Sequence, residues 1–157
     1  MNDFARILKT LDESAVHYIL VGGVAAVAHG AARLTQDIDV VYERSPENLA
    51  RLVQALGPLH PYLRGAPPGL PFRFDVATIQ AGLNFTLITD LGALDLLGEI
   101  AGGGGFQALA NRTNELDVFG TRCLCLDLPT LIHVKKAAGR PKDYEAISEL
   151  QAILDQR

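Results

Sequence analysis

The spacing of apolar residues along the chain predicts helices and strands in alternation. Apolar side chains at helical spacing predict helices over 3–14 and 46–56, because residues three and four positions apart share one face of a helix. Short apolar runs predict strands over 18–21 and 37–42. Between these two strands, the alanine-rich residues 24–29 predict a short helix.

The second half of the chain predicts further strands and two closing helices. Residues 84–89 and 93–97 are expected to form a hairpin, with further strands up to about Phe119 and Cys125. Gly139 is then expected to end one helix and Pro141 to begin the next, since glycine ends helices and proline opens them.

This order of elements predicts the fold class. The economical architecture is α/β (α+β), a mixed β-sheet covered by helices, in one domain that spans residues 1–157. Residues 57–71 are rich in proline and glycine and predict a long irregular segment, which we expect to border the functional site.

Composition narrows the class of protein. A hydrophobic content of 48% in 157 residues is enough for a continuous core. No apolar stretch approaches the roughly 18 residues of a membrane span, so we expect a cytoplasmic protein. A net charge of −4 argues against broad, non-specific binding to nucleic acid. Cys123 and Cys125 are expected to be reduced thiols packed on one face of a strand.

Candidate chemistry begins with two aspartates. Asp37 and Asp39 are two positions apart in a predicted strand, so both carboxylates point to the same face. Paired hard oxygen ligands suit Mg²⁺, which uses one or two protein carboxylates and completes its shell with water and phosphate. The alternative is a solvated strand end whose aspartates cap the following turn.

Two glycines precede this pair. Gly22 and Gly23 stand between a strand and a helix, where backbone N–H groups and the positive helix end attract anions. A plain tight turn is the alternative. Arg33, in the loop that leads to the aspartates, is placed to reach a phosphate, or to pair with Asp37 or Asp39 when no ligand is bound.

Together these residues resemble a known family. The glycine pair, the following helix and the motif R-x-T-x-D-I-D-V are similar to the active-site signature of the nucleotidyltransferase superfamily that includes DNA polymerase beta. The nearest resemblance is to minimal nucleotidyltransferases, including those related to abortive-infection toxins. Many relatives have Gly-Ser where this chain has Gly22-Gly23, so a hydroxyl contact to phosphate is missing here.

The resemblance implies an activity. It implies a Mg²⁺-dependent enzyme, with Mn²⁺ as a substitute, that moves a nucleoside monophosphate from a nucleoside triphosphate to a hydroxyl of an RNA, a protein or a small molecule. It further implies metal binding by Asp37 and Asp39, and nucleotide binding by Gly22, Gly23, Arg33 and Thr35. A toxin–antitoxin system would add a tRNA or protein acceptor and a cognate antitoxin as partners. The competing interpretation is a non-catalytic module on the same fold that binds a nucleotide or a partner.

The superfamily uses a third carboxylate from a later strand, and this sequence offers four candidates. Asp95 is favoured, because TDLGALDLLGEI resembles the corresponding segment of the minimal family. Asp75 is the next candidate, and Asp117 and Asp127 fit edge-strand or turn positions better. The role expected for the third carboxylate is to orient or deprotonate the attacking group.

A basic cluster lies near the end of the chain. Taken by itself, the cluster fits a solvent-exposed helix C-terminus, where the helix dipole stabilises positive charge. The minimal family has a similar lysine, arginine and aspartate motif, which matches Lys135, Arg140 and Asp143. The resemblance implies that Lys135 and Arg140 contact nucleotide phosphates and that Asp143 holds one of them in place. Lys136 is the rival to Lys135.

Overall fold

A computed structural model describes residues 2–157 of the chain, which form one seven-stranded sheet and its covering helices. The helices are α1 (Phe4–Glu13), α2 (Gly22–Ala28), α3 (Pro46–Leu56), α4 (Val76–Ala81), α5 (Phe106–Leu109), α6 (Leu128–Ala138) and α7 (Tyr144–Asp155). The strands are β1 (Tyr18–Val21), β2 (Asp37–Tyr42), β3 (Tyr62–Leu63), β4 (Phe85–Thr89), β5 (Gly92–Leu97), β6 (Thr113–Val118) and β7 (Thr121–Leu126).

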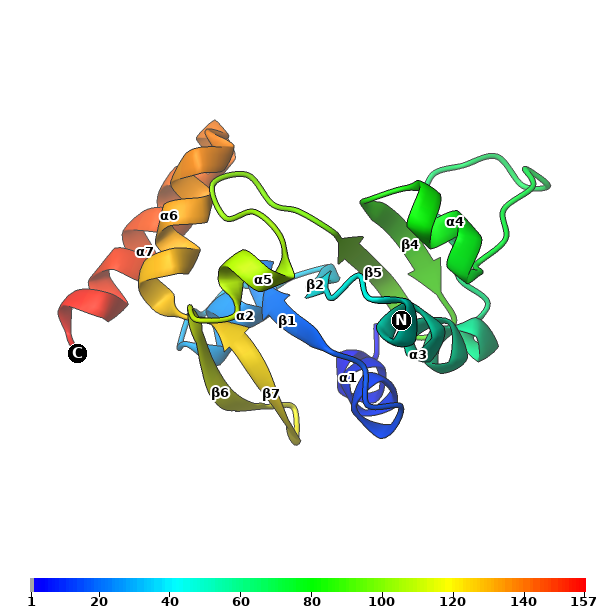
Figure 1. Cartoon of the computed structure of the whole chain (residues 1–157). Coiled ribbons are helices and arrows are strands. Elements are labelled where there is room, and N and C mark those ends of the chain that lie inside the picture. Colours follow the sequence, from blue (N-terminus) through cyan, green and yellow to red (C-terminus); the bar gives the residue numbers. More distant parts are fainter. Residues whose placement is uncertain (1) are drawn as a thin grey trace.

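The sheet is mixed, which confirms the predicted fold class. The strands follow the order β3-β4-β5-β2-β1-β7-β6. Figure 1 labels all of them except the short edge strand β3. Two neighbouring pairs are parallel, β2 with β5 and β1 with β7, and the other pairs are antiparallel. The central strands β1 and β2 lie next to each other, so the glycines that follow β1 come close to the aspartates of β2.

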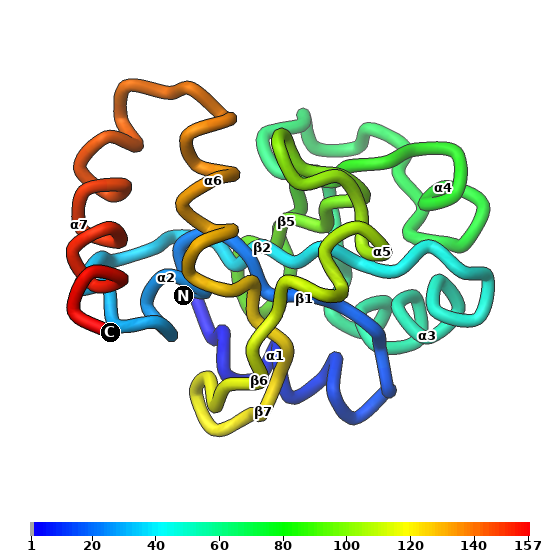
Figure 2. The backbone as a smooth tube through the Cα atoms, turned by 60° about the vertical axis from the view of Figure 1, so that its left-hand side comes forward, coloured from blue at the N-terminus to red at the C-terminus, as the bar shows by residue number. Residues whose placement is uncertain are grey.

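The helices lie in separate groups around this sheet. α1 and α3 pack together, while α6 and α7 run side by side at the other end of the molecule (Figures 1 and 2). The end of the chain returns to α2, where Arg157 Nη2 donates to the carbonyl oxygen of His29 at 3.1 Å. His29 is buried at the C-terminal end of α2, and its Nε2 lies 2.9 Å from the carbonyl oxygen of Leu126.

Local sequence explains where the helices begin. The side chains of Asp3, Ser45, Asp75 and Asp127 each accept a hydrogen bond from the backbone N–H three residues later, at the starts of α1, α3, α4 and α6. Such caps satisfy backbone donors that a helix leaves free, and each contributes about 1 kcal/mol. Gly139 ends α6 with a positive φ of 67°, as expected for a glycine that stops a helix.

Three features differ from the predictions. The segment 57–71 is not wholly irregular, because it contains β3, a two-residue edge strand paired with β4. The short helices α4 and α5 were not expected, since six and four residues are too few to show helical periodicity. The glycine pair does not precede the helix but forms its first residues, because α2 begins at Gly22.

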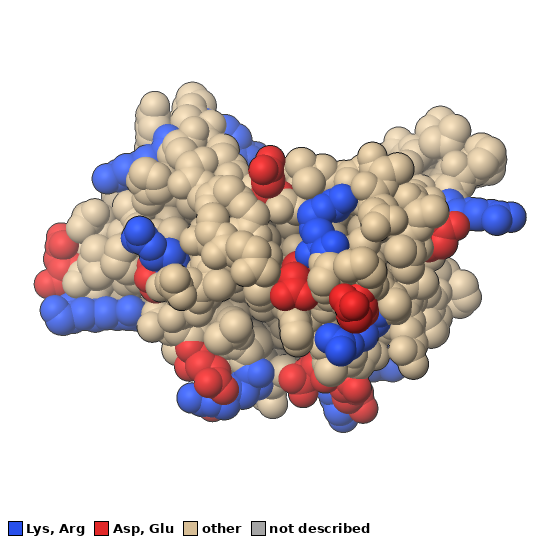
Figure 3. All heavy atoms as spheres, viewed as in Figure 1, with Lys and Arg blue, Asp and Glu red and all other residues tan. Residues whose placement is uncertain are grey.

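Surface charge bears on nucleic-acid binding, and helix length bears on whether a membrane can be spanned. On the face seen in Figure 3, acidic and basic side chains lie in small mixed groups rather than in one basic patch. Among residues 2–157, no helix combines the length and apolar character that a membrane span requires.

Candidate active site

Three aspartates meet on the two parallel strands β2 and β5. Asp39 lies opposite Asp95 in the register of these strands. Asp37, two residues earlier in β2, points to the same face of the sheet as Asp39. Each carboxylate offers an oxygen that lies within 4.8 Å of one on each of the other two. The structure therefore brings Asp95 to the predicted aspartate pair, through strand pairing rather than through sequence proximity.

Asp39 is the most perturbed of the three. Burial raises the pKa of its carboxyl group to about 8, with further contributions from a hydrogen bond with Asp95 and from the charge of Asp37. Its Oδ1 atom is buried and has no hydrogen-bond partner. A buried acceptor without a donor is costly, and a bound cation would satisfy it. The donor set is entirely carboxylate oxygen, which fits Mg²⁺ or Mn²⁺.

The glycines form a close cradle against this carboxylate. Gly22 has a φ of +69°, a conformation that glycine adopts without strain, and a Cβ atom at this position would collide with Asp39 Oδ2. A Cβ atom on Gly23 would lie 2.9 Å from Thr35 Oγ1. Thr35 in turn donates to the carbonyl oxygen of Asp37 at 2.8 Å. Both glycines are thus required for the start of α2 to approach the aspartates and their loop.

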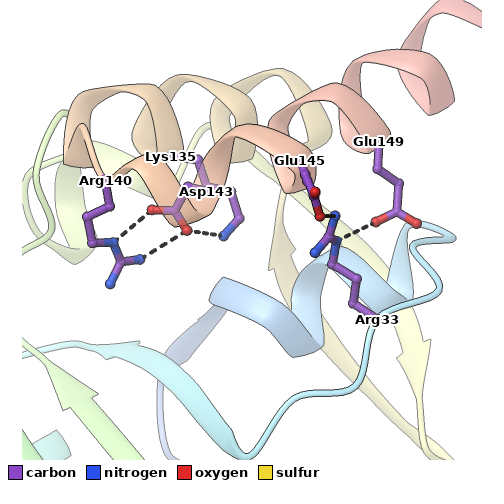
Figure 4. A network of polar contacts seen from close by, with 6 residues as sticks. All are labelled: Arg33, Lys135, Arg140, Asp143, Glu145 and Glu149. Carbon is purple, nitrogen blue, oxygen red and sulfur yellow. Dashed lines mark hydrogen bonds and ion pairs between the residues drawn. The ribbon is translucent and has the colours of Figure 1, made fainter.

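The predicted basic cluster lies on the turn between α6 and α7. Figure 4 shows Lys135 and Arg140 converging on Asp143, which is buried. Arg140 Nε donates to Asp143 Oδ2 at 2.7 Å, and Lys135 Nζ lies 3.5 Å from Asp143 Oδ1. Burial raises the pKa of Asp143, but the hydrogen bond from Arg140 and the charge of Lys135 outweigh it, and the net shift is downward. It is Lys135, rather than its neighbour Lys136, that forms this ion pair.

Arg33 does not pair as predicted. Instead of Asp37 or Asp39, it contacts two glutamates of α7, with Nε 3.1 Å from Glu149 and Nη2 3.7 Å from Glu145 (Figure 4). Glu149 also accepts a hydrogen bond from the backbone N–H of Ala32 at 3.0 Å. Because α7 packs over the loop that carries Arg33, the glutamates are nearer to its guanidinium than the predicted partners.

A different arginine occupies the predicted place. Arg64, just after β3, donates from Nη2 to Asp95 Oδ1 at 2.6 Å, and the same nitrogen lies 3.6 Å from Asp37 Oδ2. The sequence interpretation did not select this residue. Arg64 stands in a proline- and glycine-rich segment with no motif around it, and only the pairing of β3 with β4 brings it to the site.

The site residues predicted from the sequence line one cavity of about 400 Å³, a size within the range of small-molecule sites. It lies between the strand ends and the α6–α7 turn. Its walls are formed by the three aspartates, the two glycines, the loop residues after α2, and side chains of the last two helices: Gly22, Gly23, Ala26, Arg33, Leu34, Thr35, Gln36, Asp37, Asp39, Asp95, Lys135, Arg140, Lys142, Asp143, Ala146 and Glu149.

The other acidic candidates have structural positions elsewhere. Asp75 and Asp127 cap α4 and α6, and the hydrogen bonds from Thr78 to the Asp75 carboxylate lower its pKa. Asp117 is exposed on the edge strand β6, where its carboxylate lies 3.7 Å from Arg122. Among the described residues, the one group of three or more potential metal ligands is Asp37, Asp39 and Asp95.

Comparison with known proteins identifies the fold. No protein-family model and no curated protein sequence matches the chain. A proposed nucleotidyltransferase from Thermotoga maritima aligns with a TM-score of 0.60 at 15% identity, over 98% of this chain and 91% of that chain. The lincosamide antibiotic adenylyltransferase LnuA, solved with lincomycin, aligns with a TM-score of 0.62 at 18% identity, over 94% and 93%.

A second antibiotic-modifying enzyme is similar to the same extent. ANT(2'')-Ia, solved in complex with adenylyl-2''-tobramycin, aligns with a TM-score of 0.59 at 16% identity, over 98% of this chain and 86% of that chain. These alignments span nearly the whole chain, so the resemblance is not restricted to the aspartate motif. The chain has the nucleotidyltransferase fold.

Proposed function

We propose that this protein is a Mg²⁺-dependent nucleotidyltransferase that transfers a nucleoside monophosphate from a nucleoside triphosphate to an acceptor hydroxyl and releases pyrophosphate. The observation that carries the proposal is the convergence of Asp37, Asp39 and Asp95 beside a glycine cradle in one cavity. The three carboxylates come from two strands, and the cavity's opposite wall is basic, which is the charge arrangement that a metal-bound triphosphate requires.

The aspartates have separate roles in this proposal. Asp37 and Asp39 hold the divalent cation, which is Mg²⁺ or, as a substitute, Mn²⁺. When bound, the cation neutralises charge on the triphosphate and on the pyrophosphate leaving group. Asp95 accepts the proton of the acceptor hydroxyl, whose oxygen forms the new bond to the α-phosphorus. The bond between the α-phosphorus and the α–β bridging oxygen breaks, and its electron pair leaves with pyrophosphate.

The glycine cradle and the basic wall hold the nucleotide. Backbone N–H groups at Gly22 and Gly23 face the cavity at the start of α2 and donate to phosphate oxygens. Lys135 and Arg140 supply positive charge from the opposite wall, in positions fixed by their shared partner Asp143.

Arg33 and Thr35 act from the loop between α2 and β2. Thr35 fixes the backbone of this loop through its bond to Asp37, so its contribution to nucleotide binding is to hold the loop in place. Arg33 contacts phosphate only after it leaves Glu149 and Glu145, because both glutamates now satisfy its guanidinium.

The acceptor class forms the second part of the proposal. Two neighbours of the same fold carry antibiotics in their solved structures, lincomycin and an adenylylated tobramycin. A small hydroxyl-bearing molecule is therefore a candidate acceptor. The resemblance to abortive-infection toxins adds an RNA end or a protein as an acceptor, and an antitoxin as a partner.

The proposal is tested by label transfer. The purified protein is incubated with each α-labelled nucleoside triphosphate, Mg²⁺, and either total RNA, a protein extract or a panel of hydroxylated antibiotics. Transfer of label by the wild type, and its loss in Asp39→Asn, is the expected result. Nucleotide or partner binding without transfer in any combination would contradict it and would favour a regulatory module. Free nucleoside monophosphate as the sole product would indicate a hydrolase.

A further inference from the structure

Arg64 contacts two carboxylates of the acidic cluster. Its Nη2 atom lies 2.6 Å from Asp95 Oδ1 and 3.6 Å from Asp37 Oδ2, so one guanidinium bridges two of the three carboxylates. The side chain of Arg64 is 30% exposed and that of Asp95 is 20% exposed. A pair so shielded from solvent is screened less than a surface ion pair, and its charges interact correspondingly more strongly.

The arginine is held in this position by the edge of the sheet. Its backbone N–H donates to the carbonyl oxygen of Thr86 at 2.9 Å, and its Nη1 donates to that of Leu87 at 3.1 Å. Both carbonyls belong to β4, the strand next to β5. Arg64 therefore reaches the aspartates from the β4 side, whereas the glycine cradle follows β1 on the other side of β2.

Three basic residues that line the cavity have partners outside the three aspartates. Lys135 and Arg140 pair with Asp143, and Arg33 pairs with glutamates of α7. Within residues 2–157, Arg64 is the one basic residue with an ion pair to the three aspartates. The positive charge that balances these aspartates therefore comes from a single side chain.

A divalent cation needs the same oxygens. Asp37 is one of the two proposed ligands of the cation, and Asp95, whose Oδ1 accepts from Arg64, belongs to the same group of potential metal ligands. A guanidinium at 2.6 Å and a cation on the same carboxylate would repel each other and compete for the same lone pairs.

We propose that Arg64 is an internal counter-ion that occupies the metal-binding carboxylates in the metal-free protein and must leave them for a divalent cation to bind. The inference rests on the proposed function in taking Asp37 and Asp39 as the ligands of the cation, with Asp95 beside them in the same site. Arg64 thereby lowers the affinity of these carboxylates for a divalent cation, and it stabilises the carboxylates when no cation is bound.

The test is a cation titration without nucleotide. Binding of Mn²⁺ and Mg²⁺ is measured by isothermal titration calorimetry for the wild type, Arg64→Gln, Arg64→Lys and the control Arg73→Gln. Arg73 is exposed just beyond the segment that carries Arg64, so its replacement makes the same change in net charge away from the aspartates. We expect Arg64→Gln to bind Mn²⁺ about tenfold more tightly, because the competing charge is gone. Arg64→Lys keeps the positive charge, and Arg73→Gln leaves Arg64 in place. Both variants should bind Mn²⁺ with an affinity close to that of the wild type.

A second measurement needs no variant. In nitrogen-15 NMR of the metal-free wild type, the ion-paired guanidinium of Arg64 should show slowly rotating Nη groups, and Mg²⁺ should average their signals as the side chain is released. Unchanged or weaker cation binding by Arg64→Gln, or Arg64 signals insensitive to bound Mg²⁺, would overturn the inference. If neither the wild type nor Arg64→Gln binds a divalent cation, both this inference and the metal-dependent function fail.

Discussion

Replacing Asp39 with asparagine should stabilise the metal-free protein. Asp39 has a pKa near 8 in the folded chain, against 3.8 for a free aspartate, because it is buried beside Asp95 and Asp37. Folding at neutral pH therefore either takes up a proton or buries a charge, and both are unfavourable. One pKa unit corresponds to about 1.4 kcal/mol, so the full shift would cost about 4 kcal/mol at pH 7. Asp39 is only partly buried and solvent screens its charge, so the expected cost is about 2–4 kcal/mol. Asparagine has nearly the same shape, carries no charge and still donates a hydrogen bond.

The pH dependence gives the prediction its sign. A carboxyl group with a raised folded pKa costs nothing below about pH 4, where it is protonated in both the folded and the unfolded chain. The cost grows as pH rises from 4 and levels off above about 8. The advantage of Asp39→Asn over the wild type should therefore be near zero at pH 4 and largest at pH 8.

Thermal unfolding in EDTA measures this difference. For a chain of this size, the advantage at pH 7.5 should raise the melting temperature of Asp39→Asn by roughly 5–10 °C. Adding Mg²⁺ should raise the melting temperature of the wild type and leave that of the variant almost unchanged. Asp117→Asn, on the exposed edge strand, is the matched control and should stay within about 0.5 kcal/mol of the wild type. The reasoning is refuted if Asp39→Asn is no more stable than the wild type in EDTA at pH 7.5, or if its advantage does not change with pH.

Three further predictions concern the walls of the cavity. Gly22→Ala should lower the melting temperature and abolish stabilisation by Mg²⁺, since a Cβ atom would strain a φ of +69° and collide with Asp39, a proposed metal ligand. An unchanged Mg²⁺ response in thermal unfolding would contradict this. Lys135→Ala should weaken binding of a fluorescent nucleoside triphosphate by about ten- to a hundredfold, because a charge-assisted contact is lost. Lys136→Ala should have little effect on this binding. Equal effects of the two substitutions would argue against the proposed contact. Glu149→Gln should strengthen nucleotide binding by about threefold, because it releases Arg33 toward the cavity. Weaker binding in the same assay would show that the Arg33–Glu149 ion pair instead supports the site.

Most of the fold could be predicted from local pattern. β1, β2 and α3 have the predicted bounds, because each has a clear apolar pattern. Gly22 follows β1 directly, and Ser45 and Pro46 mark the start of α3. Asp37 and Asp39 share a face because alternation in a strand is a purely local property. The two-residue strand β3 had no such signal, since its conformation depends on β4 rather than on its own sequence.

Contacts in the candidate site between residues far apart in the sequence could not be predicted from local pattern. The segment around Asp95 pointed to that residue only through a resemblance, and the register with Asp39 then placed it beside the pair. Arg33 and Glu149 are 116 positions apart, so no local pattern could indicate their contact. Arg64 reaches the aspartates by way of tertiary hydrogen bonds to β4. The charge of an arginine does not indicate which arginine will form an ion pair with the aspartates, so Arg33 was predicted where Arg64 is found.

The most direct measurement is a crystal structure with Mn²⁺ and a non-hydrolysable nucleoside triphosphate, with anomalous data collected at the manganese edge. The account predicts an anomalous peak at bonding distance from Asp37 and Asp39, Arg64 displaced from Asp95, and phosphates between the Gly22–Gly23 backbone and Lys135. Manganese bound away from these aspartates, or a nucleotide bound outside this cavity, would contradict it.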